Sequence, residues 1–412
     1  MTDLGTRVTR RGPAALRRAA PALAGYAAVR VLGLLALAVW SAARDKSAYT
    51  LLTARWDALW YTRVAELGYG YEVRLPNGDV HSDLAFFPLL PWLERLLHAV
   101  TPLSYADAGF TVSLLASVAA AWGIFAVADR VHGRRAGVCA VLVWAVLPVG
   151  IVQSMAYSES LFTALAAWSL YAVLTDRWVA AGALASLAGL TRPVGIAVVA
   201  AVWAAGVLSF VRDRSAEPAR SARTTARAPR SSGDPSSRRE GVTGGARVTA
   251  RAVGLLVAPL GAAGHVLWVG RRTGRGPLGY LDVQAGWRNG FDGGYAFTRF
   301  VLEKFTSVPS AFAGAGLVVG VALLIRLYVV CVRQRQPLPL LVYAGAVLAL
   351  ALCASSYFGS KPRLLLPAFP LLFPLALALS RLRPARCALV VAGVAAASAV
   401  YGAWWLNGSG PP

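Results

Sequence analysis

Long apolar stretches recur along this 412-residue chain and limit its possible folds more than any other feature. A helix of about 20 apolar residues spans a bilayer, and eleven stretches approach that length. Only 15% of the residues are charged, against about 25% in a typical soluble domain. The sequence therefore predicts an all-α polytopic membrane protein, a bundle of about eleven transmembrane helices. The stretches are 21–43, 108–129, 136–153, 158–175, 178–191, 193–211, 252–270, 308–331, 338–356, 364–380 and 387–406.

Arginines in the short connecting loops predict how the bundle is oriented. If the basic N-terminus, 1–20, is cytoplasmic, every inner loop is basic, as the positive-inside rule requires. The long outer segments are then 44–107 and 271–307, and the tail 407–412 is also outside. Within 178–211, Thr191-Arg192-Pro193 interrupts a long apolar run, which allows either two short spans or one broken span. The second option would reverse the orientation of everything that follows.

The net charge of +22 is explained by these inner loops, so nucleic acid is not an expected partner. Lysine is rare and arginine, alanine and glycine are abundant, which is typical of a GC-rich bacterial genome. The expected location is the cell membrane. The basic start and the apolar run to Ala43 resemble a signal peptide, but the run is long enough to be retained as a first span. The four cysteines form no CxxC pair and the four histidines have no metal-ligand spacing, so neither disulfides nor zinc are expected.

One segment, 212–251, differs in composition from the rest of the chain. It is rich in arginine, serine, proline and glycine, and it has no aromatic residue. Such a segment cannot bury a core, so the sequence predicts a disordered basic cytoplasmic linker, either passive or regulatory. It would separate an N-terminal membrane module, 21–211, from a C-terminal module, 252–406.

The first outer segment, 44–107, is the expected place for chemistry. It holds 8 of the 19 acidic residues of the chain, and carboxylates avoid lipid. If 55–66 is helical, Asp57, Trp60 and Tyr61 share a face. An Asp among aromatic residues near the membrane needs a partner, and Arg55 is a plausible one. The aromatic rings in this segment suit either an interfacial belt or the stacking of a sugar. The alternative for Asp57 is that it only caps a helix.

The stretch from Phe86 to Val100 is strongly amphipathic. Glu94, Arg95 and His98 share one face, and apolar side chains cover the rest. This pattern predicts an interfacial helix on the outer leaflet. It either guides a lipid-linked substrate towards Asp57 or only packs against the membrane.

Several motifs, in order along the chain, resemble those of the PIG-V-like mannosyltransferases, which belong to the GT-C class of membrane glycosyltransferases. The most specific is the first outer loop, with RWDALWY at 55–61, AELGY at 65–69 and AFFPLLP at 85–91. Weaker similarities follow in AYSESLF at 156–162, TRPVG at 191–195 and RLLLPAFP at 363–370. The resemblance implies a GT-C-like bundle with a long first extracytoplasmic loop. The segment 212–251 has no counterpart in the family pattern.

The resemblance also implies a function. The donor would be a polyprenyl-phosphate sugar, with mannose expected, and the acceptor an extracytoplasmic lipid, glycan or protein. An inverting transfer needs a base to take the proton of the acceptor hydroxyl, and the resemblance places Asp57 in that role. The leaving phosphate needs positive charge, for which Arg192, Lys361 and Arg363 are candidates. The remaining expected substrate-binding residues are Arg55, Trp56, Trp60, Tyr61, His81, Asp83 and Glu159.

Glu159 would orient Arg192 or the acceptor, with a purely structural salt bridge as the alternative. No cofactor is expected. No metal is expected either, although a pairing of Asp57 with Asp83 stays open. Two other classes of function compete with the transferase: a transporter or lipid flippase, and a non-catalytic scaffold of envelope assembly. Transporters place ionisable groups near the bilayer midplane, whereas the predicted spans hold almost none. A neutral result on replacing Asp57 would favour a scaffold.

Overall fold

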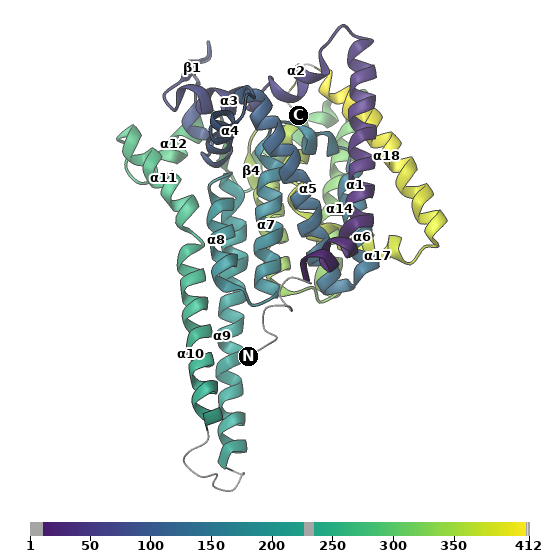
Figure 1. The fold of residues 1–412 in the computed structure, drawn as a ribbon. Coiled ribbons are helices and arrows are strands. Elements are labelled where there is room, and N and C mark those ends of the chain that lie inside the picture. The colour runs from purple at the N-terminus through teal and green to yellow at the C-terminus, as the bar shows by residue number, and fades with distance from the viewer. Residues whose placement is uncertain (1–10, 226–234, 409, 411–412) are drawn as a thin grey trace.

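The computed structural model describes residues 11–225, 235–408 and 410 as a bundle of helices (Figure 1). The longest helices are α1 (Arg11–Ala42), α5 (Tyr105–His132), α9 (Ile196–Thr225), α10 (Pro235–Val257), α14 (Val308–Arg333) and α18 (Pro384–Leu406). Shorter helices complete the bundle: α6 (Arg134–Ala145), α7 (Ser158–Leu174), α8 (Trp178–Gly189), α11 (Leu260–Thr273), α15 (Leu338–Cys353) and α17 (Phe373–Ser380).

Small elements gather mainly at one end of the bundle, which we call the loop end (Figure 1). They are α2 (Ala48–Thr53), α3 (Asp57–Leu67), α4 (Leu89–Val100), α12 (Gly279–Gly286), α13 (Tyr295–Glu303), α16 (Lys361–Leu364) and the strands β1 (Glu72–Arg74), β2 (Val80–Ser82), β3 (Gly290–Phe291) and β4 (Ala354–Ser355). The opposite end, where α5 ends and α6 begins, is called the basic end because Arg134, Arg135 and Arg177 lie there.

The expected all-α, multi-pass architecture is confirmed. Within the described ranges, six helices are long and apolar enough to cross a membrane. A seventh span results if the pair Phe358–Leu364 and Phe369–Ser380, bent by 76°, is one crossing. Helices α7, α8 and α15 are apolar but shorter. The predicted number of eleven is therefore not confirmed.

The interruption at 190–195 separates two helices. Helix α8 ends at Gly189, Arg192 is extended, and a 3₁₀ helix over Pro193–Gly195 leads into α9. Proline disfavours the α conformation in the residue that precedes it, which explains why the chain breaks at Arg192. The Leu89 amide of the first loop donates to the Leu190 carbonyl at 3.0 Å. The break thus lies against the first loop, and it separates the short α8 from the long α9.

The expected linker at 212–251 is largely helical. Helix α9 continues through Thr225 and α10 begins at Pro235, while 226–234 lie outside the described residues. Alanine and arginine are strong helix formers, which offsets the low hydrophobicity of the segment. An ion pair between Arg251 and Asp213, 2.8 Å long, joins the two helices. They project together beyond the basic end (Figure 1). The division into two membrane modules stays a prediction.

The two long loops expected outside the membrane pack against each other at the loop end. Strands β1 and β2 form an antiparallel hairpin, and α12 of the second segment contacts β2. A small apolar core formed by Leu84, Phe87, Val269, Tyr280 and Val283 holds them together. Strand β3 pairs with β4, which ties the second segment to the chain just before α16. Segments far apart in the sequence are therefore fixed at one end of the bundle.

Helix α4 is amphipathic, and of its polar side chains Glu94 is buried, His98 is half-buried and Arg95 is exposed. Glu94 is fully buried against α5, while Trp92, Leu96 and Val100 are exposed. These three apolar side chains therefore point away from the bundle, as in a helix that lies on a lipid surface, while Leu90 packs inside it.

Candidate functional site

Asp57 stands at the start of α3, directly after a residue with an unusual backbone. Trp56 has φ 51° and ψ −123°, a conformation that side-chain-bearing residues rarely adopt. Such a residue costs about 1–3 kcal/mol and persists only when the surrounding structure holds it. The turn at Trp56 directs the Asp57 carboxylate back towards the bundle, where the ends of α7, α8 and α16 meet.

Four charged side chains meet there and form what we call the ion-pair cluster: Asp57, Glu159, Arg192 and Arg363. Arg363 Nη1 lies 2.7 Å from Asp57 Oδ2 and 3.6 Å from Glu159 Oε1. Arg192 also pairs with Glu159. Two acids and two arginines balance, which is what makes their burial tolerable. The side chain of Asp57 is 23% exposed and that of Glu159 only 2%.

Hydroxyl groups extend the cluster on one side. The hydroxyls of Tyr61 and Ser158 share a hydrogen bond of 2.7 Å, and Arg192 Nη1 donates to Ser158 Oγ at 3.4 Å. Burial raises the pKa of Tyr61, so its hydroxyl stays protonated. The guanidinium of Arg363 lies over the Tyr157 ring, 5.1 Å from its centroid. These contacts fix both arginines, since each is held by a carboxylate and a neighbouring polar or aromatic group.

An aromatic cluster lies beside Tyr61. Trp60 stacks on Phe86 with ring centroids 5.5 Å apart, and Trp287 meets Trp60 edge-on at 4.9 Å. His81 stacks on the other side of the group, 4.0 Å from Trp287. Tyr61 joins through an edge contact with Phe86. The rings come from both long loops and form one wall next to the ion-pair cluster.

Asp83 holds the first loop in shape. Its carboxylate accepts hydrogen bonds from the Gly70 and Tyr71 amides, both at 2.9 Å. Burial raises the pKa of Asp83, and the two amide hydrogen bonds counteract that rise. Both amides belong to the turn after α3, so this side chain positions the loop, and it does not join the ion-pair cluster.

Two expected contacts differ in the structure. The partner of Asp57 is Arg363 and not Arg55, whose guanidinium lies 4.0 Å above the Trp56 ring. Lys361 is buried and donates to the carbonyls of Ala351 and Ala354, each at 2.7 Å. Its ammonium is thus engaged by the end of α15, outside the ion-pair cluster. Arg55 does not pair with Asp57 because it stacks on Trp56. Lys361 does not join the cluster because its ammonium binds carbonyls at the end of α15.

Sequence reasoning left two residues of this site without a role. Trp287 completes the aromatic wall, and Tyr157 lies under Arg363. The aromatic and polar mixture of 271–307 was a signal for the first. The second lies within the AYSESLF motif, but nothing in the sequence linked it to Arg363. Among the described residues, no group of three or more His, Cys, Asp or Glu side chains has a metal-binding arrangement.

Solved structures that resemble this chain come from two kinds of protein. ArnT from Cupriavidus metallidurans bound to undecaprenyl phosphate has a TM-score of 0.49 and 18% identity, over 89% of this chain and 63% of that one. The oligosaccharyltransferase AglB from Archaeoglobus fulgidus, in complex with an inhibitory peptide and a dolichol-phosphate, has a TM-score of 0.46 and 13% identity, over 94% and 56%. The chain thus spans less than two thirds of the length of either.

Among protein families, the model described as dolichyl-phosphate-mannose-protein mannosyltransferase matches residues 83–218. No curated protein sequence matches the chain. The matched segment contains Glu159 and Arg192, and it ends before Arg363 and begins after Asp57. The similarity therefore covers one side of the ion-pair cluster, and the narrower PIG-V-like resemblance stays a prediction.

Proposed function

We propose that the protein is a membrane glycosyltransferase that moves a sugar from a polyprenyl-phosphate donor to an extracytoplasmic lipid, glycan or protein acceptor. Mannose is the expected sugar, and inversion the expected outcome. The observation that carries the proposal is the Asp57–Arg363–Glu159–Arg192 cluster, in which the partly exposed carboxylate of Asp57 pairs with Arg363 while the buried Glu159 holds both arginines. The family match at 83–218 supports it independently.

Asp57 is the group best placed to act as the base. The side chain of Asp57 is the more exposed of the two acids in the cluster, whereas that of Glu159 is almost completely buried. In the proposed reaction the acceptor hydroxyl oxygen attacks the anomeric carbon, Asp57 takes the hydroxyl proton, and the bond from that carbon to the lipid phosphate breaks. A positioned base contributes about 10²–10⁴-fold to such a step.

Arg363 and Arg192 would stabilise the departing phosphate. Arginine presents several donors in a fixed plane, which suits a phosphate group. Within the described part of the chain, Arg363 Nε has no hydrogen-bond acceptor, whereas Nη1 pairs with Asp57. Glu159 pairs with both arginines, so its proposed role is to hold them at the spacing that the phosphate needs. Lys361 has no direct part in this proposal, because two backbone carbonyls already bind its ammonium.

The aromatic wall would bind the sugar. Ligand sites are lined mainly by apolar and aromatic side chains with a few polar groups that fix orientation. Trp60, Phe86 and Trp287 supply such a surface beside Tyr61, and the Tyr61 hydroxyl shares Ser158 with Arg192. We place this site on the extracytoplasmic face, because the positive-inside rule assigns the loop end to that side.

Transport is the alternative function, and one buried charge within a span bears on it. Arg30 of α1 is buried, but its guanidinium donates to the carbonyls of Ala145 and Gly150 and lies 5.6 Å from the Tyr26 ring centroid. The first carbonyl belongs to the last residue of α6 and the second to the 3₁₀ helix that follows, Gly150–Ser154. Arg30 therefore holds a helix end in place, and the structure offers no observation that favours a transport site there.

The experiment compares matched acids of the first loop. Asp79 pairs with Arg288 and is 22% exposed, close to the 23% of Asp57, yet it lies outside the cluster. Membranes that contain wild-type protein, Asp57→Asn or Asp79→Asn at equal amounts are given polyprenyl-phosphate mannose with a radiolabelled sugar. We expect transfer by the wild type and by Asp79→Asn, and a loss of about 100-fold or more in Asp57→Asn. Equal transfer by all three would remove Asp57 from the mechanism.

A further inference from the structure

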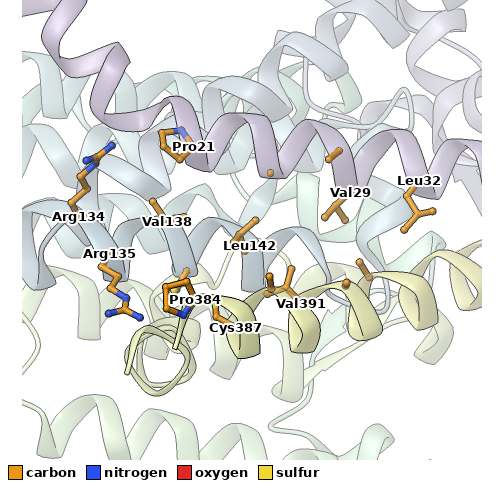
Figure 2. Close-up of a pocket in the computed structure, with 16 residues that line it drawn as sticks. Pro21, Val29, Leu32, Arg134, Arg135, Val138, Leu142, Pro384, Cys387 and Val391 are labelled. Atoms are coloured by element: carbon orange, nitrogen blue, oxygen red, sulfur yellow. The ribbon is translucent and has the colours of Figure 1, made fainter. Parts of the chain in front are cut away.

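An open apolar groove lies between α1, α6 and α18, and its lining contains no residue of the ion-pair cluster. Figure 2 shows side chains of all three helices lining it, among them Pro21, Leu142 and Val391. Its volume is about 730 Å³, within the roughly 300–1,000 Å³ of small-molecule sites. Apart from two arginines, apolar side chains, cysteines and glycine form its lining. The groove therefore suits a hydrocarbon chain.

The length of the groove corresponds to one leaflet of a bilayer. Along α1 it extends from Pro21 to Leu32. With a rise of about 1.5 Å per residue, this stretch is about 16 Å long. The hydrocarbon core of a bilayer is about 30 Å thick, so the groove reaches from one surface to about the midplane.

The two arginines lie together at one end of the groove. Arg134 and Arg135 begin α6 at the basic end, near Pro21 and Pro384 (Figure 2). Both are exposed, and each donates to a backbone carbonyl, that of Arg18 or Leu382. In the part of the chain that the structure describes, neither pairs with a carboxylate, and the nearby Asp129 is engaged by Arg18 at 2.9 Å. Their positive charge is therefore available to an anion at the membrane surface.

We propose that this groove binds an anionic phospholipid of the leaflet at the basic end. One acyl chain would lie between α1, α6 and α18, and the headgroup phosphate would contact Arg134 and Arg135. In the orientation expected from the sequence this is the cytoplasmic leaflet, opposite the transfer site. The proposal stands apart from the transferase, because none of its residues belongs to the ion-pair cluster or the aromatic wall.

The test counts bound lipid on the purified full-length protein. Detergent-solubilised protein is equilibrated with phosphatidylglycerol, phosphatidylcholine or undecaprenyl phosphate, and retained lipid is measured by native mass spectrometry. Arg134→Gln/Arg135→Gln removes the charge, with Arg177→Gln/Arg335→Gln as a control at the same end. Ala388→Trp fills the groove, and Leu389→Trp is its control, because Leu389 is 75% exposed and does not line the groove.

We expect the wild type to retain phosphatidylglycerol in preference to phosphatidylcholine. Retention should fall roughly tenfold or more in Arg134→Gln/Arg135→Gln and in Ala388→Trp, and stay unchanged in both controls. Size-exclusion profiles show whether each variant is folded, and the two unlike variants keep the test valid if one of them is not. Equal retention of the two phospholipids, unchanged retention in both groove variants, or a preference for undecaprenyl phosphate would overturn the proposal.

Discussion

Asp57 and Arg363 are far apart in the sequence and form a 2.7 Å ion pair beside the buried Glu159. The pair joins the start of α3 in the first loop to α16. Breaking a buried charge pair by removing one partner is more damaging than its net contribution suggests, since the other charge is left uncompensated. The contact therefore links the stability of the loop end to the proposed chemistry.

The first prediction concerns the charge of Arg363. Arg363→Gln should reduce transfer strongly. The leaving phosphate would lose a positive charge that stabilises it, and Asp57 and Glu159 would lose their shared arginine partner. Arg363→Lys keeps the charge and loses the planar pair of donors, so it should retain more activity than Gln and less than the wild type. Initial rates of mannose transfer at saturating donor check this order. Equal rates for Lys and Gln would show that charge at this position is irrelevant.

The second prediction separates Lys361 from catalysis. Its ammonium has two carbonyl acceptors, and hydrogen bonds to charged groups are worth about 1.5–3 kcal/mol each. Lys361→Met should therefore lower the Tm in detergent, with little effect on the KM for the donor. Lys304→Met serves as the control, because the Lys304 ammonium lies over the Phe300 ring and, among the described residues, has no such pair of acceptors. A raised donor KM at unchanged Tm would instead return Lys361 to phosphate binding.

The third prediction concerns the aromatic wall. Trp287→Ala removes the ring that joins Trp60, Phe86 and His81. It should raise the KM of the donor sugar more than it lowers kcat, because it weakens binding without touching Asp57. Trp287→Phe keeps an aromatic face and should recover most of the affinity. A change in kcat alone would contradict a role in sugar binding.

The fourth prediction follows from His81. Burial lowers the pKa of His81 below its ordinary 6.5, so the folded protein favours the neutral ring. The resulting stability is present above pH 6.5 and is lost as the pH falls through that value, where the unfolded chain binds a proton more readily. The Tm of His81→Phe should therefore fall less than the Tm of the wild type when the pH is lowered from 7.5 to 5.5. Parallel pH profiles would contradict this role for burial.

The fifth prediction concerns Glu94. Burial raises the pKa of Glu94 well above its ordinary value, and in the described structure neither carboxylate oxygen has a hydrogen-bond partner. A raised pKa of an acid favours folding at low pH, and that advantage is lost as the pH rises. Glu94→Gln removes the charge at constant shape, so it should raise the Tm at pH 7.5 and have little effect near pH 4. A lower Tm at pH 7.5 would mean that the ionised group has a partner.

Much of the architecture could be predicted from patterns that depend on neighbouring residues alone. Apolar length identified the helices, and Thr191-Arg192-Pro193 marked a helix break. The linker at 212–251 was predicted less well, since its composition argued for disorder while helix propensity and the pairing of Arg251 with Asp213 favour α9 and α10. The predicted number of eleven crossings also exceeded the six or seven helices that are both long enough and apolar enough to cross a membrane in the described structure.

The sequence by itself determined that the chain is a helical membrane protein, and it put Asp57, Glu159, Arg192 and Arg363 in a wider set of polar candidates that also held Arg55, His81, Asp83 and Lys361. Only the tertiary structure decided how they combine: Arg363 rather than Arg55 meets Asp57, Lys361 binds backbone carbonyls, and Trp287 completes a wall begun by Trp60. The physical reason is range. Hydropathy, helix propensity and proline effects act over a few residues, whereas an ion pair or a ring contact between distant segments depends on how the whole bundle packs.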